Sequence, residues 1–369
     1  LQELITNKQW LPNYFVLIFI PGCSPELKKN LEDEYYKQGI IIIDEAVILD
    51  LVLAETKGSN PVGKLRALML NSKSLQEIDI FKINQLVDNQ TSIFVGRDTA
   101  IERIVTSGEN YALYGGRRIG KSSVLNAVRE RLEQRSFLVA TFSFEGQKIC
   151  ADTVVVLSLA RELKLPHVTN LDTFDIAIGE YLNANSSQRI AILLDEIDKY
   201  IEHNPKRHLL IERFRSLSER YPTRFRVIVA GFMELYKCMQ LRGPYTPTSD
   251  PWQRMFRHMP LENLKAENAE AIVREGFIEI LGWEFEHRSI PLLVVQRTGG
   301  HPAFVQKFCE KLQQLVAKRG DRTVKIHDLQ IIFEDQQPED GFIAFVGKTL
   351  EMNLGKVARY VIFSLVLLN

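Results

Sequence analysis

The sequence has few cysteines, and their spacing does not pair them. There is no Cys-x-x-Cys pair and no histidine spacing suited to zinc. The cysteines are far apart in the chain, at Cys23, Cys150, Cys238 and Cys309. This pattern argues against a small disulfide-stapled domain and against a zinc site, and it is typical of the reduced thiols of a cytoplasmic protein.

Two further absences narrow the class of protein. The longest apolar run, residues 360–368 with one serine, is shorter than the roughly 18 residues that a membrane span needs, and we expect no signal peptide. Lys and Arg total 46 and Asp and Glu total 46, so the net charge does not indicate a protein that coats nucleic acid or a membrane. We expect no membrane partner.

The size of the chain predicts more than one domain. With 369 residues, 45% of them hydrophobic, it is long enough for two or three cores. It begins with leucine rather than methionine and ends inside a helix-like pattern. We therefore expect the sequence to be part of a longer chain.

A phosphate-binding loop is the most informative motif. Gly115, four further residues and then Gly120-Lys121-Ser122 fit the pattern Gly-x-x-x-x-Gly-Lys-[Ser/Thr], in which backbone N–H groups surround the phosphates of a nucleotide. Residues 111–114 predict a buried strand before the loop, and residues 122–132 predict a helix after it. The helix N-terminus adds the positive end of a dipole beside the phosphates. The motif predicts ATP as ligand, ADP as product and Mg²⁺ as cofactor.

Each part of this loop has an expected role. Lys121 is expected to reach the outer phosphates and act in catalysis, and the Ser122 hydroxyl is expected to hold Mg²⁺. The whole loop is expected to contact the nucleotide, through Gly115, Gly116, Arg117, Arg118, Ile119, Gly120, Lys121, Ser122 and Ser123. The alternative is a glycine-rich turn between two core elements.

A second motif supplies the acids that a hydrolytic site needs. The stretch from Arg189 predicts a buried strand that ends in Asp195 and Glu196. Asp195 is expected in the Mg²⁺ shell, through water or through Ser122, and Glu196 is expected to activate the water that attacks the γ-phosphate. The alternative is a buried strand followed by an acidic turn.

Residues 225–230 predict a further buried strand. In the additional-strand class of P-loop ATPases, this strand lies between the strand before the loop and the strand that carries the acids. A polar side chain often follows it and orients water, whereas this sequence has Gly231 and Phe232 there. This departure predicts slow turnover.

Two further signals flank the core. Val95 and Gly96 are expected near adenine, by resemblance to the base pocket of AAA-like ATPases, and the alternative is a helix start capped by Asp98. Arg254 and Arg257 lie where AAA-like ATPases often carry an arginine finger for a neighbouring subunit. The alternative is that both are surface arginines.

The N-terminal residues 1–57 predict a partial α/β domain. A strand, a helix that begins at Ser24, a second strand and a helix capped by Asp44 follow one another. Their order resembles the second half of a restriction-endonuclease-like fold, whose metal-binding carboxylates lie on earlier elements, so no nuclease residue is carried over. The alternative is a structural or partner-docking domain. Residues 58–91 are polar and have linker character.

After the ATPase core expected at 92–264, the pattern becomes helical. One helix is predicted over 265–281, and another follows the turn Gly299-Gly300-His301-Pro302. These helices predict a helical lid over 265–335. Residues 336–369 are expected to begin a winged helix that the sequence truncates.

Three stretches together resemble the STAND and archaeal-type ATPases, a clade close to the AAA+ proteins. They are the loop with its paired Arg117 and Arg118, the Leu-Asp-Glu stretch and the Gly-Gly-His-Pro turn. The resemblance covers about residues 92–330 and implies an α/β fold, with a parallel-sheet P-loop core of the additional-strand type followed by the lid. It also implies that His301 and Pro302 contact the nucleotide as the lid closes, where the alternative is a simple helix start.

The resemblance implies a nucleotide-gated switch, and three other functions stay open. We favour a slow ATPase switch that is stimulated by self-association or by a protein partner. The second function is a DNA-engaging ATPase resembling origin-recognition initiators, which would contact DNA through the winged helix. Their loop is usually Gly-Thr-Gly-Lys-Thr, unlike the loop of this sequence. The third is a nucleotide-binding scaffold with little hydrolysis, and the fourth is a nucleolytic effector.

Overall fold

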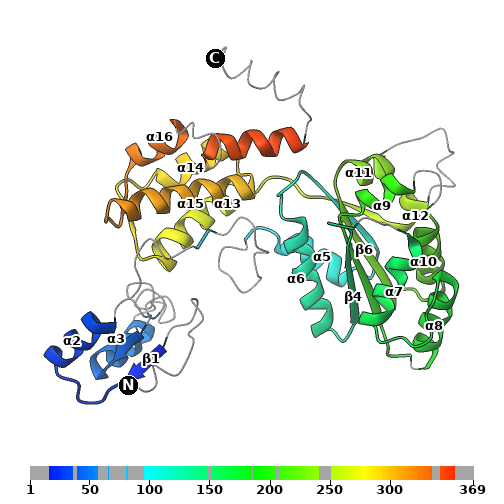
Figure 1. The fold of residues 1–369 in the computed structure, drawn as a ribbon, viewed down its shortest axis with the longest axis horizontal. Helices are drawn as coiled ribbons and strands as arrows, with labels where there is room; N and C mark the ends of the chain where they lie inside the picture. The colour runs from blue at the N-terminus through cyan, green and yellow to red at the C-terminus, as the bar shows by residue number, and fades with distance from the viewer. Residues whose placement is uncertain are drawn as a thin grey trace, which may run out of the picture. The chain divides into compact units, whose positions relative to one another are not determined.

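The structure is a computed structural model (Figure 1), and the chain divides into two compact units. It describes residues 16–35, 40–56, 65, 80–81, 95–147, 151–184, 186–204, 208–240, 251–334 and 341–353. The first unit contains Leu1–Ile83, Glu270–Arg297 and Val305–Ile343, and the second contains Asn84–Ala269, Thr298–Phe304 and Ala344–Asn369. Most of the expected linker, and the expected winged helix beyond residue 353, lie outside the described residues.

The second unit contains a parallel sheet. Its five described strands follow the order β4-β5-β6-β3-β7. Their bounds are β3 Tyr111–Tyr114, β4 Leu138–Ser143, β5 Ile190–Asp195, β6 Phe225–Gly231 and β7 Arg257–Pro260. β6 pairs with β5 on one side, where Leu194 is opposite Val229, and with β3 on the other, where Tyr114 is opposite Gly231. The predicted position of strand 225–230 is confirmed, and the carboxyl ends of β3, β5 and β6 meet at one edge.

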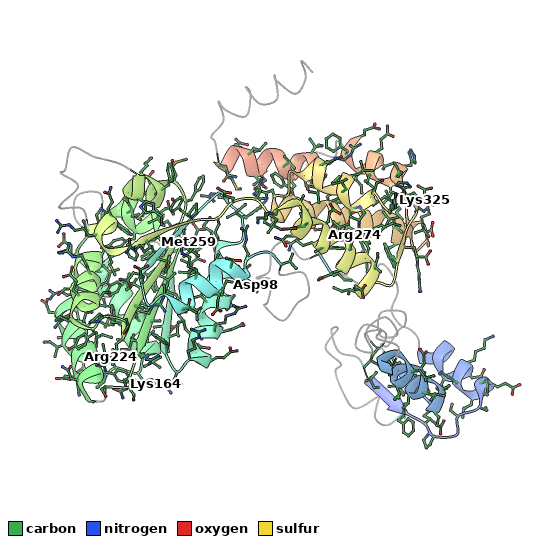
Figure 2. All side chains as sticks on the ribbon, turned by 180° about the vertical axis from the view of Figure 1, so that it is seen from behind. Asp98, Lys164, Arg224, Met259, Arg274 and Lys325 are labelled. Carbon is green, nitrogen blue, oxygen red and sulfur yellow. The ribbon has the colours of Figure 1, made fainter. Side chains whose placement is uncertain are left out.

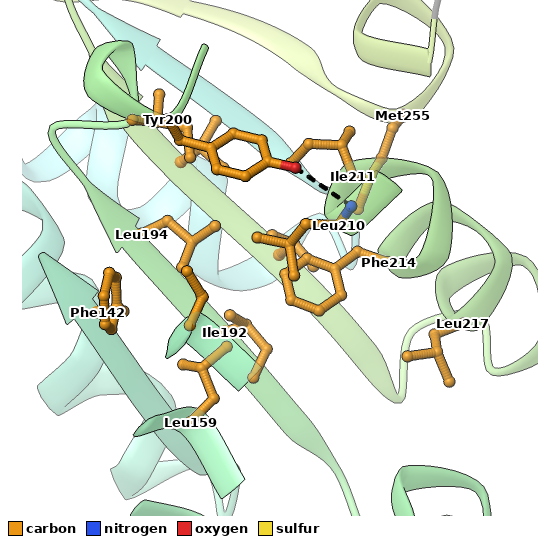
Figure 3. Close-up of a cluster of buried hydrophobic side chains, with 14 of the residues drawn as sticks. Phe142, Leu159, Ile192, Leu194, Tyr200, Leu210, Ile211, Phe214, Leu217 and Met255 are labelled. Atoms are coloured by element: carbon orange, nitrogen blue, oxygen red, sulfur yellow. Dashed lines mark hydrogen bonds between the residues drawn. The ribbon is translucent and has the colours of Figure 1, made fainter. Parts of the chain in front are cut away.

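Helices cover both faces of this sheet (Figure 1). They are α5 Asp98–Thr106, α6 Lys121–Gln134, α7 Asp152–Glu162, α8 Leu171–Ala184, α9 Asp198–His203, α10 Leu209–Arg220, α11 Met233–Gln240 and α12 Pro251–Met255. Side chains alternate between the faces of a strand, so each face has its own core. Tyr111 and Leu113 belong to a cluster with α5 and α6, whereas Ala112 and Tyr114 belong to one with α7, α8 and α10. Figure 3 shows part of the second cluster around Leu194.

A buried arginine ties α5 to the sheet. Arg226 on β6 is 1% exposed, and its guanidinium donates to the carbonyl oxygens of Ile104, Val105 and Glu109. The last carbonyls of a helix lack partners inside the helix, so the arginine satisfies groups that burial would otherwise leave unpaired. Burial lowers the pKa of Arg226 to about 10, which still leaves it charged at neutral pH. α5, which follows Val95 and Gly96, is thereby held against β6.

The first unit begins with the small α/β arrangement that the sequence predicts. β1 Val16–Phe19 pairs in parallel with β2 Ile40–Ile43, and the helices are α2 Pro25–Tyr35 and α3 Glu45–Thr56. The Ser24 hydroxyl accepts a hydrogen bond from the Leu27 N–H at 3.2 Å, and the Asp44 carboxylate accepts one from the Val47 N–H at 2.9 Å. Both predicted caps are confirmed.

The segments after residue 264 are mainly helical, as predicted. They comprise α13 Ala266–Arg274, a π-helix at Glu275–Ile280, β8 Glu284–Phe285, α14 Ile290–Thr298, α15 Pro302–Lys318, β9 Thr323–Val324 and α16 Ile326–Glu334, and a last described helix covers 342–353. Among the described residues, no helix is long and apolar enough to cross a membrane.

The single α-helix predicted over 265–281 is wrong in its last turns, which are π-helical. Within the first unit, Gly276 lies against the ring of Phe81, where an added Cβ would be 2.3 Å from the phenyl Cζ. Phe81 is fully buried and packs on Phe277, with ring centroids 5.2 Å apart. The apolar spacing of this helix gives no sign of a distant aromatic side chain, so the sequence could not reveal the change.

Candidate functional site

The predicted phosphate loop connects β3 to α6. Its backbone enters the left-handed region at Arg118, with φ of 62°, and at Gly120, with φ of 97°. Gly115 lies against the backbone after β7, because a Cβ added to it would be 2.5 Å from the Leu261 carbonyl oxygen. The loop therefore turns sharply at the edge where the strands end, directly before the N-terminus of a 14-residue helix.

The Lys121 side chain folds back over this loop. Its ammonium donates to the carbonyl oxygens of Gly115 and Gly116, at 3.0 and 3.1 Å. It also lies 5.9 Å from the centroid of the Phe232 ring. Burial lowers the pKa of Lys121, while the nearby carboxylate of Glu196 acts in the opposite direction. The lysine is thus a buried cation at the centre of the loop.

Ser122 and Asp195 meet as the sequence predicts. The Ser122 hydroxyl donates to Asp195 Oδ2 at 2.6 Å, and the other carboxylate oxygen accepts the Glu196 N–H at 2.9 Å. Burial raises the pKa of Asp195, and the Ser122 hydrogen bond works against that rise. A hydroxyl from α6, next to Lys121 in the chain, and a carboxylate from β5 therefore lie in contact.

Glu196 has an unusual backbone. Its φ is 54°, a left-handed value that a residue with a Cβ rarely adopts. The Ile197 N–H donates to the Ala230 carbonyl at 3.0 Å and so fixes the turn against β6. Burial raises the pKa of Glu196, and Lys121 lowers it. The turn aims a carboxylate at the same edge of the sheet that carries the loop.

This donor set fits Mg²⁺ and a phosphate chain. Hydroxyl and carboxylate oxygens are ligands that Mg²⁺ accepts, and it usually takes only one or two of them from the protein, with phosphates and water completing its shell. The Ser122 and Asp195 oxygens are 2.6 Å apart. Among the described residues, no group of three or more His, Cys, Asp or Glu side chains could hold a metal ion. The Ser122 and Asp195 oxygens therefore suit a metal whose other ligands are phosphates and water.

Arg97 also holds the loop, although the sequence did not single it out as a site residue. One guanidinium nitrogen donates to the carbonyl oxygens of Ile119, at 3.1 Å, and Glu262, at 2.8 Å. The neighbouring Gly96 has φ of 75°, and a Cβ added there would lie 2.6 Å from the Asn268 amide. The glycine of the Val95-Gly96 pair is thus required by close packing, whatever ligand lies near it.

The alternative interpretation of Asp98 as a helix cap is wrong. Asp98, labelled in Figure 2, is the first residue of α5, and the preceding Arg97 occupies the cap position without a side-chain cap. The Asp98 carboxylate instead pairs with Arg131 on α6 at 3.1 Å. An acidic residue in the first turn still suits the helix dipole.

His301 lies in the second unit with its ring buried. It is 8% exposed, and its ring stacks on Phe304 with centroids 4.2 Å apart. Burial lowers the pKa of His301 to about 4. A hydrogen bond with the Arg117 backbone works against this fall, and the positive charges of Arg97, Arg118 and Lys121 add to it. Pro302 begins α15, as the helix-start interpretation predicts.

Residues 344–353 contact the phosphate loop, which the sequence did not predict. The Asn353 side-chain oxygen accepts the Arg117 N–H at 2.8 Å. Arg118 donates to the Thr349 hydroxyl at 2.9 Å, and its guanidinium carbon lies 4.4 Å from the centroid of the Phe345 ring. The two loop arginines that are distinctive in sequence are thus both engaged by a segment more than 200 positions away in the chain.

The two candidate finger arginines are both exposed. Arg257 is opposite Tyr111 in the register of β7 and β3, at the end of the sheet remote from the phosphate loop. Its guanidinium pairs with Glu109 at 2.8 Å. Arg254 lies on α12. A role toward a neighbouring subunit stays a prediction for both.

Comparison with known proteins identifies the fold. No family model and no curated protein matches the sequence. The solved ORC2 protein of Aeropyrum pernix, in ADPNP and ADP complexes, is similar with a TM-score of 0.50 and 13% identity, over 68% of this chain and 69% of that one. The chain has an AAA-like P-loop NTPase fold. At this identity the likeness shows the fold alone, with its parallel additional-strand sheet and the helical lid that follows.

Other solved structures with this fold are less similar. The Walker-type ATPase PABY2304 of Pyrococcus abyssi has a TM-score of 0.45 and 16% identity, over 78% of each chain. A point variant of RuvB from Thermotoga maritima has a TM-score of 0.42 and 14% identity, over 70% of this chain and 76% of that one. Function must therefore be argued from the residues of the site.

Proposed function

We propose that this chain binds ATP with Mg²⁺ and hydrolyses it slowly, as a nucleotide-dependent regulatory switch. The observation that carries the proposal is the hydrogen bond of 2.6 Å between Ser122 and Asp195, formed beside the buried ammonium of Lys121. A serine, a lysine and an acid from two different elements converge at the N-terminus of α6. That convergence suits the binding of a metal–triphosphate, whereas packing of the hydrophobic core does not require it.

Each residue then has a distinct task. The backbone N–H groups of the loop surround the phosphates, and Lys121 leaves the carbonyls of Gly115 and Gly116 to neutralise the outer phosphates. Ser122 and Asp195 hold the metal, directly or through water. Glu196 accepts a proton from the attacking water, for which its turn is already fixed. Bound Mg²⁺ supplies neutralisation of charge on the phosphate oxygens.

The switch part of the proposal comes from residues 344–353. Asn353 accepts the Arg117 N–H of the loop, and Thr349 and Phe345 hold Arg118. Any ligand that changes the loop changes these contacts, and by linkage the contacts change the affinity for the ligand. We infer that nucleotide binding and the docking of residues 344–353 are coupled.

The buried His301 supports the same coupling. Burial keeps the ring neutral, and the nearby cations of Arg97, Arg118 and Lys121 add to this effect. An anionic phosphate near these cations would offset their charge. We propose that His301 and Pro302, with Val95 and Gly96 on the base side, sense the nucleotide.

Steady-state hydrolysis of ATP by the full chain tests the enzymatic part. We expect slow turnover by the wild-type protein, loss of binding and turnover in Lys121→Ala, and binding without turnover in Glu196→Gln. The exposed Lys318→Ala and Glu219→Gln serve as matched controls and should behave as wild type. Absence of ATP binding by the wild-type chain would overturn the proposal.

Two added conditions separate the alternative functions. If double-stranded DNA raises the rate severalfold, the chain is a DNA-engaging ATPase rather than a switch read by a protein. If ATP binds tightly and no phosphate is released under any condition, the chain is a nucleotide-binding scaffold. The proposed switch predicts a low rate that DNA does not change.

A further inference from the structure

The Asp198 carboxylate lies beside Gly231 at the end of β6, where ATPases of the additional-strand class often have a polar side chain and this sequence has none. Asp198 is the first residue of α9, three positions after Asp195, and is 9% exposed. A Cβ added to Gly231, at the end of β6, would lie 2.5 Å from Asp198 Oδ2. The space beside Gly231 is therefore filled by a carboxylate that comes from the neighbouring strand's turn.

The Asp198 carboxylate is bound on both of its oxygens. Oδ2 accepts the Phe232 N–H at 2.5 Å, and Oδ1 accepts the N–H groups of Glu234, at 2.7 Å, and Leu235, at 3.2 Å. These are the residues that leave β6 and begin α11. One side chain thus joins the turn after β5 to the segment after β6.

Two groups of the proposed site lie next to this junction. Glu196, with its left-handed backbone, is two residues before Asp198, and the intervening Ile197 N–H is bound to the Ala230 carbonyl at 3.0 Å. Phe232, whose N–H Asp198 accepts, carries the ring that lies 5.9 Å from the Lys121 ammonium. The junction therefore fixes the backbone directly after Glu196 and the backbone at Phe232.

We propose that Asp198 is a positioning residue for ATP hydrolysis, which holds the Glu196 turn against the end of β6. This role presupposes the ATPase activity proposed above. A misplacement of about 1 Å in a reacting group can cost on the order of 100-fold in rate. Asp198 has no hydrogen bond to the phosphate loop among the described residues, although its charge acts on Lys121 and Glu196. Its removal should therefore lower kcat far more than it changes ATP affinity.

A purely structural role makes a different prediction. If Asp198 were only an N-terminal cap of α11, replacing it would lower the melting temperature and leave kcat of the folded protein unchanged. Asp198→Ala removes both acceptor oxygens. Asp198→Asn keeps one oxygen, which can accept either from Phe232 or from Glu234 and Leu235, and its NH₂ group then faces the remaining N–H groups. The positioning role predicts that kcat falls on the order of 100-fold in Asp198→Ala and on the order of 10-fold in Asp198→Asn.

Gly231→Ala tests the same contact from the other side. Its Cβ would collide with the Asp198 carboxylate and with Leu235 Cβ at 2.9 Å, so the carboxylate has to move. We expect a fall in kcat of similar size, and in the double Gly231→Ala, Asp198→Ala variant a fall smaller than the product of the two single effects. Multiplying effects would mean that the two residues act independently and would contradict the contact as the cause.

Tyr200→Phe provides a matched control in the same helix. The Tyr200 hydroxyl donates to Asp152 at 2.8 Å and accepts the Leu210 N–H at 3.3 Å, on elements other than β6. Its loss should lower the melting temperature and leave kcat unchanged.

The measurements are steady-state ATP hydrolysis, which gives kcat, equilibrium ATP binding by the full chain, and the melting temperature of each variant. Wild-type hydrolysis, a lower kcat in the Asp198 and Gly231 variants and ATP affinity within about twofold of wild type would support the inference. Wild-type hydrolysis with an unchanged kcat in Asp198→Asn and Gly231→Ala would overturn it and leave the proposed function intact. No hydrolysis by the wild-type chain would overturn both.

Discussion

Gly115 shows how one hydrogen atom in place of a side chain sets the position of the phosphate loop. An alanine Cβ there would be 2.5 Å from the Leu261 carbonyl oxygen, which is backbone and cannot rotate away. We expect Gly115→Ala to destabilise the fold by about 1–3 kcal/mol, the usual range for overpacking. The adjacent Gly116→Ala is the control, because its nearest neighbour is the Asn353 side chain at 3.7 Å. Equal melting temperatures of the two variants would contradict this explanation.

His301 gives the protein a predictable response to acid. Above pH 6.5 the ring is neutral in the folded and unfolded states. Between that pH and its folded pKa of about 4, the unfolded state binds a proton that the folded state does not, so stability falls as the pH falls. At pH 5 the loss should reach about 2 kcal/mol. Urea unfolding of wild type and His301→Leu at pH 7 and pH 5 measures it, and identical pH dependence in the two proteins would show that the ring titrates normally.

At the scale of elements, the buried Arg226 does the work of a helix cap from a neighbouring strand. Replacing it with methionine keeps most of the volume and removes the donors to Ile104, Val105 and Glu109. Unpaired buried carbonyls and a lost charged donor should cost about 3 kcal/mol of unfolding free energy. The exposed Arg129→Met, which loses only a surface pair with Glu133, should cost less than about 1 kcal/mol. A loss of less than about 1 kcal/mol of unfolding free energy in Arg226→Met would contradict the capping role.

The elements of the core could be predicted from the sequence because their signals are local. The apolar strands before Gly115 and before Asp195, and the caps at Ser24 and Asp44, depend on neighbours a few positions away. The order of the strands was predictable only through the resemblance. The π-helical end of α13 was not predictable, because it packs on Phe81 from a segment far earlier in the chain.

At the scale of the whole molecule, the candidate site brings together residues that are far apart in the sequence. The pairing of Ser122 with Asp195 followed from two separate motifs. The contacts of Asp198 and Asn353 did not, because each depends on a side chain meeting a backbone N–H from another element. Such contacts leave no spacing pattern in the sequence.

Removing the contact between residues 344–353 and the phosphate loop should raise the affinity for ATP. Asn353→Ala frees the Arg117 N–H for phosphate, and one neutral hydrogen bond is worth about 1 kcal/mol, so the ATP dissociation constant should fall about fivefold. The exposed Met352→Ala is the control and should bind ATP as wild type does. Fluorescence titration gives both constants, and weaker binding by Asn353→Ala would mean that the segment supports nucleotide binding rather than opposing it.

The central claim is that Ser122 and Asp195 hold a metal that arrives with a triphosphate gripped by Lys121. Equilibrium binding of ATP to the full chain, titrated with and without Mg²⁺, tests it most directly. The account predicts that Mg²⁺ strengthens ATP binding to the wild-type protein severalfold and that Asp195→Asn removes most of this gain. ATP binding that does not depend on Mg²⁺, or a gain that Asp195→Asn leaves intact, would contradict it.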